Sequence, residues 1–272
     1  MDLLIEKLDG SRYYLSQYKV LITDFEESAP SVTRNSKQLD QRNGNIDFGG
    51  WHTDKTINIT GYYRADDIDE EETLREKLYA LLSDPDGYYI TQLKSTPSVT
   101  MERPGETSGG YYDKLSNYPS HKRFLVYTEA PEMELVGNVN GALLYKLTAE
   151  FKTMNLPYGE TPPTDIDVSS NVSYQGTVPC NQLEQGFTVQ LTANGSASSL
   201  SFKIDDTEMT SSNAVATGDV FLLNGFSYTQ NGLSIVSKTN KAYFILQPDK
   251  PNRITCNVPG TVRILGFQNL YA

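Results

Sequence analysis

A strand, a helix and a second strand follow one another within residues 44–93, and this stretch constrains the fold more than any other. Between residues 55 and 64, apolar and polar residues alternate, which is the pattern of a strand with one buried face. The period then changes to that of an amphipathic helix over about residues 69–83. The pattern predicts a sheet with a single helix packed against it. The residues that recur on one face of this helix are Leu74, Leu78, Leu81 and Leu82.

Acidic residues mark the start of the predicted helix. Asp66, Asp67 and Asp69 are candidate N-caps, and residues 70–72 are three glutamates that place negative charge at the positive end of the helix dipole. A calcium or acid–base site is the alternative, but the run lacks the loop glycine and terminal glutamate of an EF-hand. We therefore interpret it as helix capping. Residues 83–87, Ser-Asp-Pro-Asp-Gly, end the helix, because proline cannot continue it.

Composition limits the class of protein. The 272 residues suffice for one large β domain or two ordinary ones, and no apolar run is long enough to span a bilayer. The chain is charged from its second residue, so we expect no secretory signal and no membrane insertion. A net charge of −11 argues against nucleic-acid recognition, which needs a basic surface. Cys180 and Cys256 could form a bridge, but we favour buried free thiols.

The N-terminal region, residues 1–163, alternates short strand patterns with two long polar stretches. Residues 26–45 have almost no apolar periodicity, although most connections are only about 4–6 residues long. This stretch is either disordered or an arm that gains structure against a partner, and Asn43-Gly44 favours a hairpin arm. Residues 95–120 form a second excursion, rich in proline and glycine. Strands are predicted at residues 3–5, 13–15, 20–23, 88–91, 123–128, 132–136 and 143–151.

A segment with three prolines, residues 155–164, predicts a domain boundary. Beyond it, residues 164–272 show strand and turn patterns and no helix pattern. Asn-Gly pairs punctuate short strands at regular spacing, which is typical of an antiparallel β-sandwich. Strands are predicted at 187–192, 199–204, 220–223, 226–228, 233–236, 242–246, 253–258 and 262–267.

The sequence contains no catalytic, cofactor-binding or metal-binding motif that we recognise. Its two histidines, His52 and His121, lie far apart and lack ligand spacing. Trp51 is a candidate for stacking on a ligand, but a lone tryptophan before a strand is more typical of a core or an interface. Aromatic residues of the second region could line a sugar groove, although alternation in a sandwich places such residues anyway. These are Tyr174, Phe226, Tyr228 and Tyr243.

The succession of these features resembles the distal tail protein (Dit) family of long-tailed phages of Gram-positive hosts. In the N-terminal part the resemblance rests on QRNGNIDFGG, TINITGYYR, LLSDPDG, HKRFLVYTEAPEME and LLYKLTAEFKT. In the C-terminal part it rests on GTVPCNQLEQGFTVQLTANG, ATGDVFLL, SYTQNG and PDKPNRITC. The resemblance covers the chain, which lacks room for the inserted carbohydrate-binding module of longer members. It implies a mainly β protein: an N-terminal sandwich-like domain with one helix and an arm, then a galectin-like sandwich.

The resemblance also implies a structural role in the virion, with assembly in the bacterial cytoplasm. Family members form a ring, usually of six copies, between the tail tube protein and the tail-tip hub or tail-associated lysin. Their C-terminal domains point outward and can hold receptor-binding proteins. An arm of about 20 polar residues can clasp the neighbour in such a ring. We expect Arg34, Lys37 and Arg42 to meet acidic surface on the next subunit.

Two other functions remain open. One is a carbohydrate-binding adhesion module that acts through the C-terminal sandwich. The other is an enzyme such as a cell-wall hydrolase, which we rank last because no carboxylate pair stands out from helix capping and surface charge.

Overall fold

The computed structural model describes residues 1–95, 117–139 and 141–272. It divides the chain into two compact units, residues 1–159 and 160–272. Most of the predicted excursion at residues 95–120 lies outside the described residues. Among the helices of the described ranges, none has the length and apolar character needed to cross a membrane.

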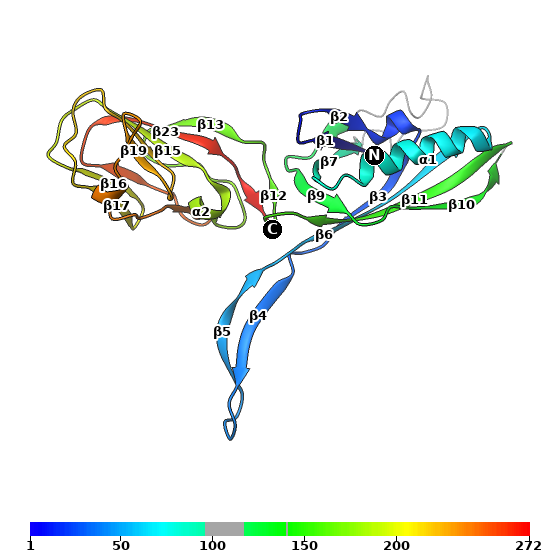
Figure 1. The fold of residues 1–272 in the computed structure, drawn as a ribbon, viewed down its shortest axis with the longest axis horizontal. Helices are drawn as coiled ribbons and strands as arrows, with labels where there is room; N and C mark the ends of the chain where they lie inside the picture. The colour runs from blue at the N-terminus through cyan, green and yellow to red at the C-terminus, as the bar shows by residue number, and fades with distance from the viewer. Residues whose placement is uncertain (96–116, 140) are drawn as a thin grey trace, which may run out of the picture. The chain divides into compact units, whose positions relative to one another are not determined.

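Nine strands of the first unit's described residues form one antiparallel sheet (Figure 1). The order is β2-β1-β7-β9-β11-β6-β3, with β8 paired to β7 and β10 paired to β11. Nearly every strand expected from sequence periodicity is present. The strands are β1 (Asp2–Lys7), β2 (Arg12–Tyr14), β3 (Leu21–Glu27), β6 (Thr56–Ala65), β7 (Tyr88–Ser95), β8 (Asn117–Pro119), β9 (Phe124–Thr128), β10 (Glu132–Val139) and β11 (Ala142–Thr153).

The predicted amphipathic helix is α1 (Ile68–Leu82), and its four leucines are buried. Asp67 is the N-cap, because its side chain accepts a hydrogen bond from the Glu70 amide at 2.8 Å. After the helix, Gly87 adopts a φ of +74°, and a Cβ there would meet the backbone oxygen of Val126 at 2.9 Å. The predicted cap and the predicted helix end are confirmed.

The core of the first unit lies between α1 and the sheet. Alternate residues of β6 point into it, including Ile57, Ile59 and Tyr63. One acidic residue of the helix, Glu71, is also buried: it accepts a hydrogen bond from the Tyr63 hydroxyl at 3.0 Å and forms an ion pair with Arg75. The charge at this position therefore has partners inside the fold, as a buried carboxylate requires.

The second unit is an antiparallel β-sandwich. Its larger sheet has the order β13-β23-β15-β18-β19-β20, its smaller sheet the order β17-β16-β22. A pair, β14 and β21, adds to them, and the last strand, β24, pairs with β12. The short strand β12 (Gly159–Glu160) spans the division between the two units. The other strands are β13 (Thr164–Val168), β14 (Cys180–Asn181), β15 (Thr188–Ala193), β16 (Leu200–Ile204), β17 (Thr207–Ser211), β18 (Val220–Leu223), β19 (Tyr228–Gln230), β20 (Leu233–Ser234), β21 (Ile245–Leu246), β22 (Ile254–Cys256), β23 (Gly260–Phe267) and β24 (Leu270–Tyr271).

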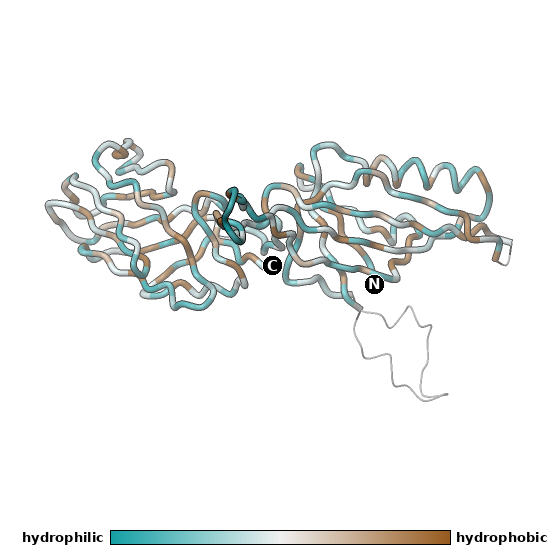
Figure 2. Tube along the Cα trace, turned by 90° about the horizontal axis from the view of Figure 1, so that it is seen from below, coloured by the Kyte–Doolittle hydropathy of each residue, from teal (hydrophilic) through white to brown (hydrophobic). Residues whose placement is uncertain are grey.

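Alternation along the strands builds the core of the sandwich. Figure 2 shows hydrophobic and hydrophilic residues interleaved along its strands. Phe202 of the smaller sheet meets Phe244 edge-on, with ring centroids 5.6 Å apart, and both rings are fully buried. The prediction of no helix in this region is wrong for one turn, α2 (Gln182–Gln185), which Asn181 caps and Gly186 ends. Four residues are too few for a periodic signal.

Both cysteines are free. Cys180 is fully buried, as expected. Cys256 was also expected to be buried, but it is only partly buried. Burial raises the pKa of the Cys180 thiol to about 12, and the nearby charge of Glu184 adds to the effect.

Candidate interaction surface

A two-stranded hairpin in the described part of the first unit is left uncovered by the rest of its fold. Its strands are β4 (Val32–Gln38) and β5 (Asn45–His52), and all their residues are exposed except Ile46, which is partly buried. We call residues 28–54, the hairpin and its root, the arm. Figure 1 shows the hairpin continuing from the ends of β3 and β6. The sequence predicted an arm at residues 26–45, so the observed arm begins later and includes all of β5.

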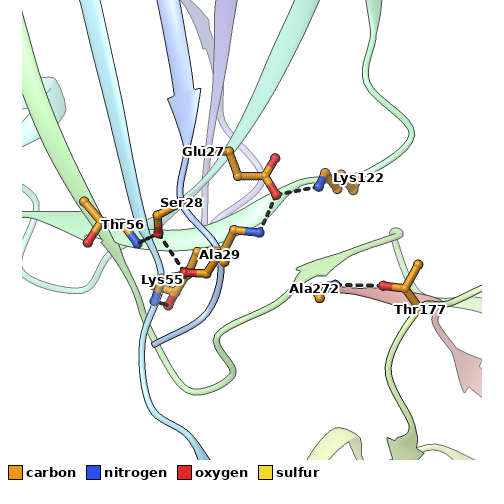
Figure 3. A network of polar contacts seen from close by, with 9 residues as sticks. Glu27, Ser28, Ala29, Lys55, Thr56, Lys122, Thr177 and Ala272 are labelled. Atoms are coloured by element: carbon orange, nitrogen blue, oxygen red, sulfur yellow. Dashed lines mark hydrogen bonds and ion pairs between the residues drawn. The ribbon is translucent and has the colours of Figure 1, made fainter. Parts of the chain in front are cut away.

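Backbone hydrogen bonds link the arm to the sheet across the short gap between the strands of the hairpin and β3 and β6. The Ser28 amide donates to the Thr56 carbonyl at 2.9 Å, and the Ser31 amide donates to the Asp54 carbonyl at 2.7 Å. The Ser28 hydroxyl also accepts a hydrogen bond from the Thr56 amide at 3.0 Å (Figure 3). The arm is therefore an extension of the β3–β6 ladder, and its direction is set where it leaves the sheet.

A charged cluster fixes the root of the arm (Figure 3). Glu27, the last residue of β3, forms ion pairs with Lys55 and with Lys122, the latter at 2.6 Å. Lys55 is 1% exposed, and its ammonium group lies 5.4 Å from the centre of the Phe124 ring. Burial is the main reason that the pKa of Lys55 is lowered. Burial alone would raise the pKa of Glu27, but the hydrogen bonds and charges of Lys122 and Lys55 outweigh it and lower that pKa.

Two glycines shape the middle of the hairpin. The register shifts between Arg34 and Ser36, which oppose Gly50 and Asp47, so β5 contains one extra residue. This is a β-bulge, and Gly49 within it has a φ of +100°. At Gly50, an added Cβ would lie 2.9 Å from the Thr33 carbonyl oxygen. Both positions therefore require glycine, one for its conformation and one for space.

The structure places the three predicted contact cations in different settings. Arg34 forms an ion pair with Asp47 across the hairpin, so its charge is already partnered within the arm. Lys37, opposite Ile46, and Arg42, in the turn, are exposed and form no ion pair with any described residue. Their contact with acidic surface on a neighbour stays a prediction, and Lys37 and Arg42 are better placed for it than Arg34.

The four predicted sugar-stacking aromatics do not form one surface. Tyr228 is 1% exposed, and its hydroxyl donates to the Ala242 carbonyl at 2.7 Å. Tyr174 is also buried, and its hydroxyl donates to the Val178 carbonyl at 2.5 Å. Their rings are therefore core residues and offer no face to a ligand, which corrects the sequence-based interpretation of these two. Phe226 and Tyr243 are exposed, and the Cβ of Tyr243 lies close to Gly225.

The remaining candidates take structural positions. Trp51 is 55% exposed on the arm and so is not a core residue. His52, at the end of β5, shares a hydrogen bond of 2.9 Å between its Nδ1 and the Tyr158 hydroxyl. Neither histidine belongs to a group of metal-ligating side chains within the ranges that the structure describes.

Sequence reasoning missed β5 as part of the arm, and with it Ile46 and Phe48. Alternation does run through Ile46, Phe48 and the following glycines, but the bulge interrupts its period before Trp51. The Gly49-Gly50 pair, a typical bulge signal inside a strand pattern, could have revealed it.

The sheet of the first unit also has open edges. Within the described residues, β3 pairs in the sheet only with β6, and β10 pairs only with β11. Exposed acidic residues lie along both edges, among them Asp24 and Glu26 on β3 and Glu132 and Glu134 on β10. Charged residues on an edge oppose unspecific strand pairing, but the backbone groups of the edge remain available to a specific partner.

Comparison with known proteins defines the class to which this fold belongs. Residues 8–179 match the family model described as phage tail protein RIFT-related domain. The match spans more than half of the chain, and the chain therefore belongs to this family of phage tail proteins. No curated protein matches the sequence.

Solved structures show which proteins have a similar fold. The crystal structure of the Dit protein of phage SPP1, described as a paradigm of the hub adsorption apparatus of phages that infect Gram-positive bacteria, aligns with a TM-score of 0.67. The alignment covers 99% of both chains at 14% identity. Two structures of the phage P2 baseplate, with Ca and with Sr, align at a TM-score of only 0.41 and 9% identity, over 98% of this chain and 97% of theirs. The family match and the shared fold confirm the resemblance to distal tail proteins.

Proposed function

We propose that this protein is a structural component of the phage tail tip that assembles into a ring, of six copies, between the tail tube protein and the tail-tip hub or tail-associated lysin. The observation that carries the proposal is the arm: its strands β4 and β5 pair with each other, and all their residues except the partly buried Ile46 are exposed. An isolated two-stranded hairpin is marginally stable in water. A partner that covers it supplies the missing packing.

A ring of identical subunits provides such a partner. In a head-to-tail arrangement, the arm of each subunit lies on the next, and the closed ring leaves no arm uncovered. The same arrangement covers the open strands β3 and β10. In this account the first unit forms the ring, and the second unit is a platform for host-adhesion components such as a receptor-binding protein. Its place is the virion tail, and it acts without catalysis.

Replacement of the hairpin tests the proposal. Joining Ser31 to Thr53 through an Asn-Gly turn removes residues 32–52 but retains the hydrogen bond of 3.0 Å between the Thr53 amide and the Ser31 carbonyl. We expect the shortened chain to fold, as judged by near-ultraviolet circular dichroism, and to be a monomer by sedimentation, whereas the full chain forms the ring. A shortened chain that assembles as well as the full chain refutes the proposal.

Carbohydrate binding by the second unit is the alternative, and the exposed pair Phe226 and Tyr243 favours it over other functions. Phe226 is 69% exposed and Tyr243 is 38% exposed. If this pair stacks on a sugar, Phe226→Ala lowers affinity for host cell-wall polysaccharide by about tenfold, whereas the exposed apolar control Leu233→Ala does not. Titration calorimetry with that polysaccharide measures both variants. Absence of binding by the unmodified chain rules the alternative out.

A further inference from the structure

The two faces of the arm differ, and the bulge is the reason. Residues that pair across a hairpin project to the same face, and successive residues project to opposite faces. Trp51 pairs with Thr33, and Ile46 pairs with Lys37, so these four share one face. Without a bulge, Phe48 would project opposite to Trp51, because the two are three residues apart. The extra residue between Asp47 and Gly50 brings Phe48 onto the face of Trp51.

We call this surface the apolar face; it consists of Ile46, Phe48 and Trp51, with Lys37 beside Ile46. Phe48 is 61% exposed and Trp51 is 55% exposed. The opposite face has Arg34 paired with Asp47, and Ser36 and Gln38 follow along β4. One face of the ribbon is thus electrostatically satisfied within the arm, and the other presents two large aromatic rings to solvent.

Exposing large aromatic side chains to water on a two-stranded hairpin is unfavourable unless a partner covers them. Phenylalanine and tryptophan are enriched at the centres of protein interfaces, where truncating one of them often costs more than tenfold in affinity. Gly49 is held at a φ of +100°, a conformation that other residues adopt only with strain. The unusual backbone conformation of Gly49 is therefore part of what brings these two rings to one side of the hairpin.

Charge indicates what covers the apolar face. Residues 28–54 contain three basic and three acidic residues and so are neutral, which leaves the whole net charge of −11 on the rest of the chain. Lys37, on the apolar face, and Arg42, at the turn, have no ion pair with described residues. The rest of a second copy of this chain is acidic, and the arm offers two cations that can meet it. This charge match favours a second copy over a partner that lacks an acidic surface.

We infer that the apolar face, rather than the face with Arg34 and Asp47, is the surface with which the arm binds the body of a second copy of this chain. The inference rests on the proposed ring and assigns its contact to particular residues. Phe48 and Trp51 are the anchors of the contact, Lys37 adds charge attraction at its rim, and the bulge at Gly49 aligns the anchors.

Charge-matched double variants test the assignment. Phe48→Glu with Trp51→Glu places two negative charges on the apolar face, and Ser36→Glu with Gln38→Glu places the same charges on the opposite face. Sedimentation equilibrium measures the affinity of self-association. We expect the first variant to lower this affinity by about tenfold or more relative to the unmodified chain, and the second variant to change it by less than about threefold. Equal effects of the two variants overturn the assignment.

Photo-crosslinking gives a readout that does not depend on ring stability. A photoreactive phenylalanine analogue is placed at position 48 or 51 and, as controls, at 36 or 38, each in the full chain. Cross-links to body residues of another copy from 48 and 51, and few from 36 and 38, support the inference. Cross-links mainly from the controls, or none from any position, overturn it.

The two sets of outcomes separate this inference from the proposed function. If the chain assembles but the hairpin replacement leaves assembly intact, the proposed role of the arm fails. If assembly depends on the hairpin but not on Phe48 and Trp51, only the assignment of the face fails.

Discussion

At the residue scale, the root of the arm depends on a carboxylate between two lysines. Glu27 offsets the charge of Lys55, which is almost fully buried, and of Lys122. Removing one partner of a buried ion pair costs more than the pair contributes, because an unpaired charge remains inside. The stability of the root of the arm therefore depends on a single side chain in β3.

Glu27→Gln tests this coupling. We expect it to lower the free energy of unfolding by about 2 kcal/mol at neutral pH, because the two lysines lose their counter-charge. The folded-state pKa of Glu27 is lowered, so its contribution is complete above its ordinary pKa of 4.5 and is lost as pH falls through the folded value. Urea unfolding should therefore show the difference from the unmodified chain shrinking in acid. Glu26→Gln, at an exposed position of the same strand, is the control and should have little effect.

The two thiols should differ in reactivity. Cys180 is fully buried with a pKa of about 12, whereas Cys256 is partly buried. Because the thiolate is the reactive form, we expect a thiol reagent at about pH 8 to modify Cys256 first and Cys180 only on unfolding. Peptide mapping of the labelled protein measures both. Fast labelling of Cys180 in the folded chain would contradict its place in the core.

At the element scale, helix α1 shows what local chemistry specifies. Its leucine stripe, its acidic start and its proline-glycine end each predict a part of the observed helix, and the N-cap is one of the three candidates. Asp67 accepts a backbone hydrogen bond that the helix cannot supply for itself.

Asp67→Ala should therefore destabilise the first unit by about 1 kcal/mol. The midpoint of thermal or urea unfolding measures the change. Asp69→Ala is the matched control, because Asp69 lies in the same acidic first turn but is not the cap. Equal losses in the two variants would mean that charge near the helix dipole, rather than capping, accounts for the effect.

The arm shows where sequence patterns fall short. Asn43-Gly44 indicated the turn correctly. No local sequence pattern, however, predicted that β4 pairs as a strand, because its seven residues are all exposed. Strand patterns reflect burial of one face, and β4 has no buried face within its own chain. Arg34 likewise could be recognised as a surface cation but not as the partner of Asp47, because the bulge at Gly49 sets that register.

In the second unit, no sequence pattern distinguished Tyr228 from Phe226, two residues before it. The fold buries Tyr228 and leaves Phe226 exposed.

At the scale of the whole molecule, the protein is a phage tail protein whose first unit leaves the arm uncovered, together with the strands β3 and β10, each of which pairs with a single strand of the sheet among the described residues. Each of these surfaces is unfavourable when a monomer leaves it exposed to water. The ring that we propose covers all three with copies of the same chain, and it needs no reactive centre.

Electron microscopy of the purified full chain tests this account most directly. We predict particles with a central opening and six-fold symmetry, in agreement with a mass about six times the 30.4 kDa of one chain. Particles that remain single chains at every concentration, alone and with the tail tube protein added, would contradict it.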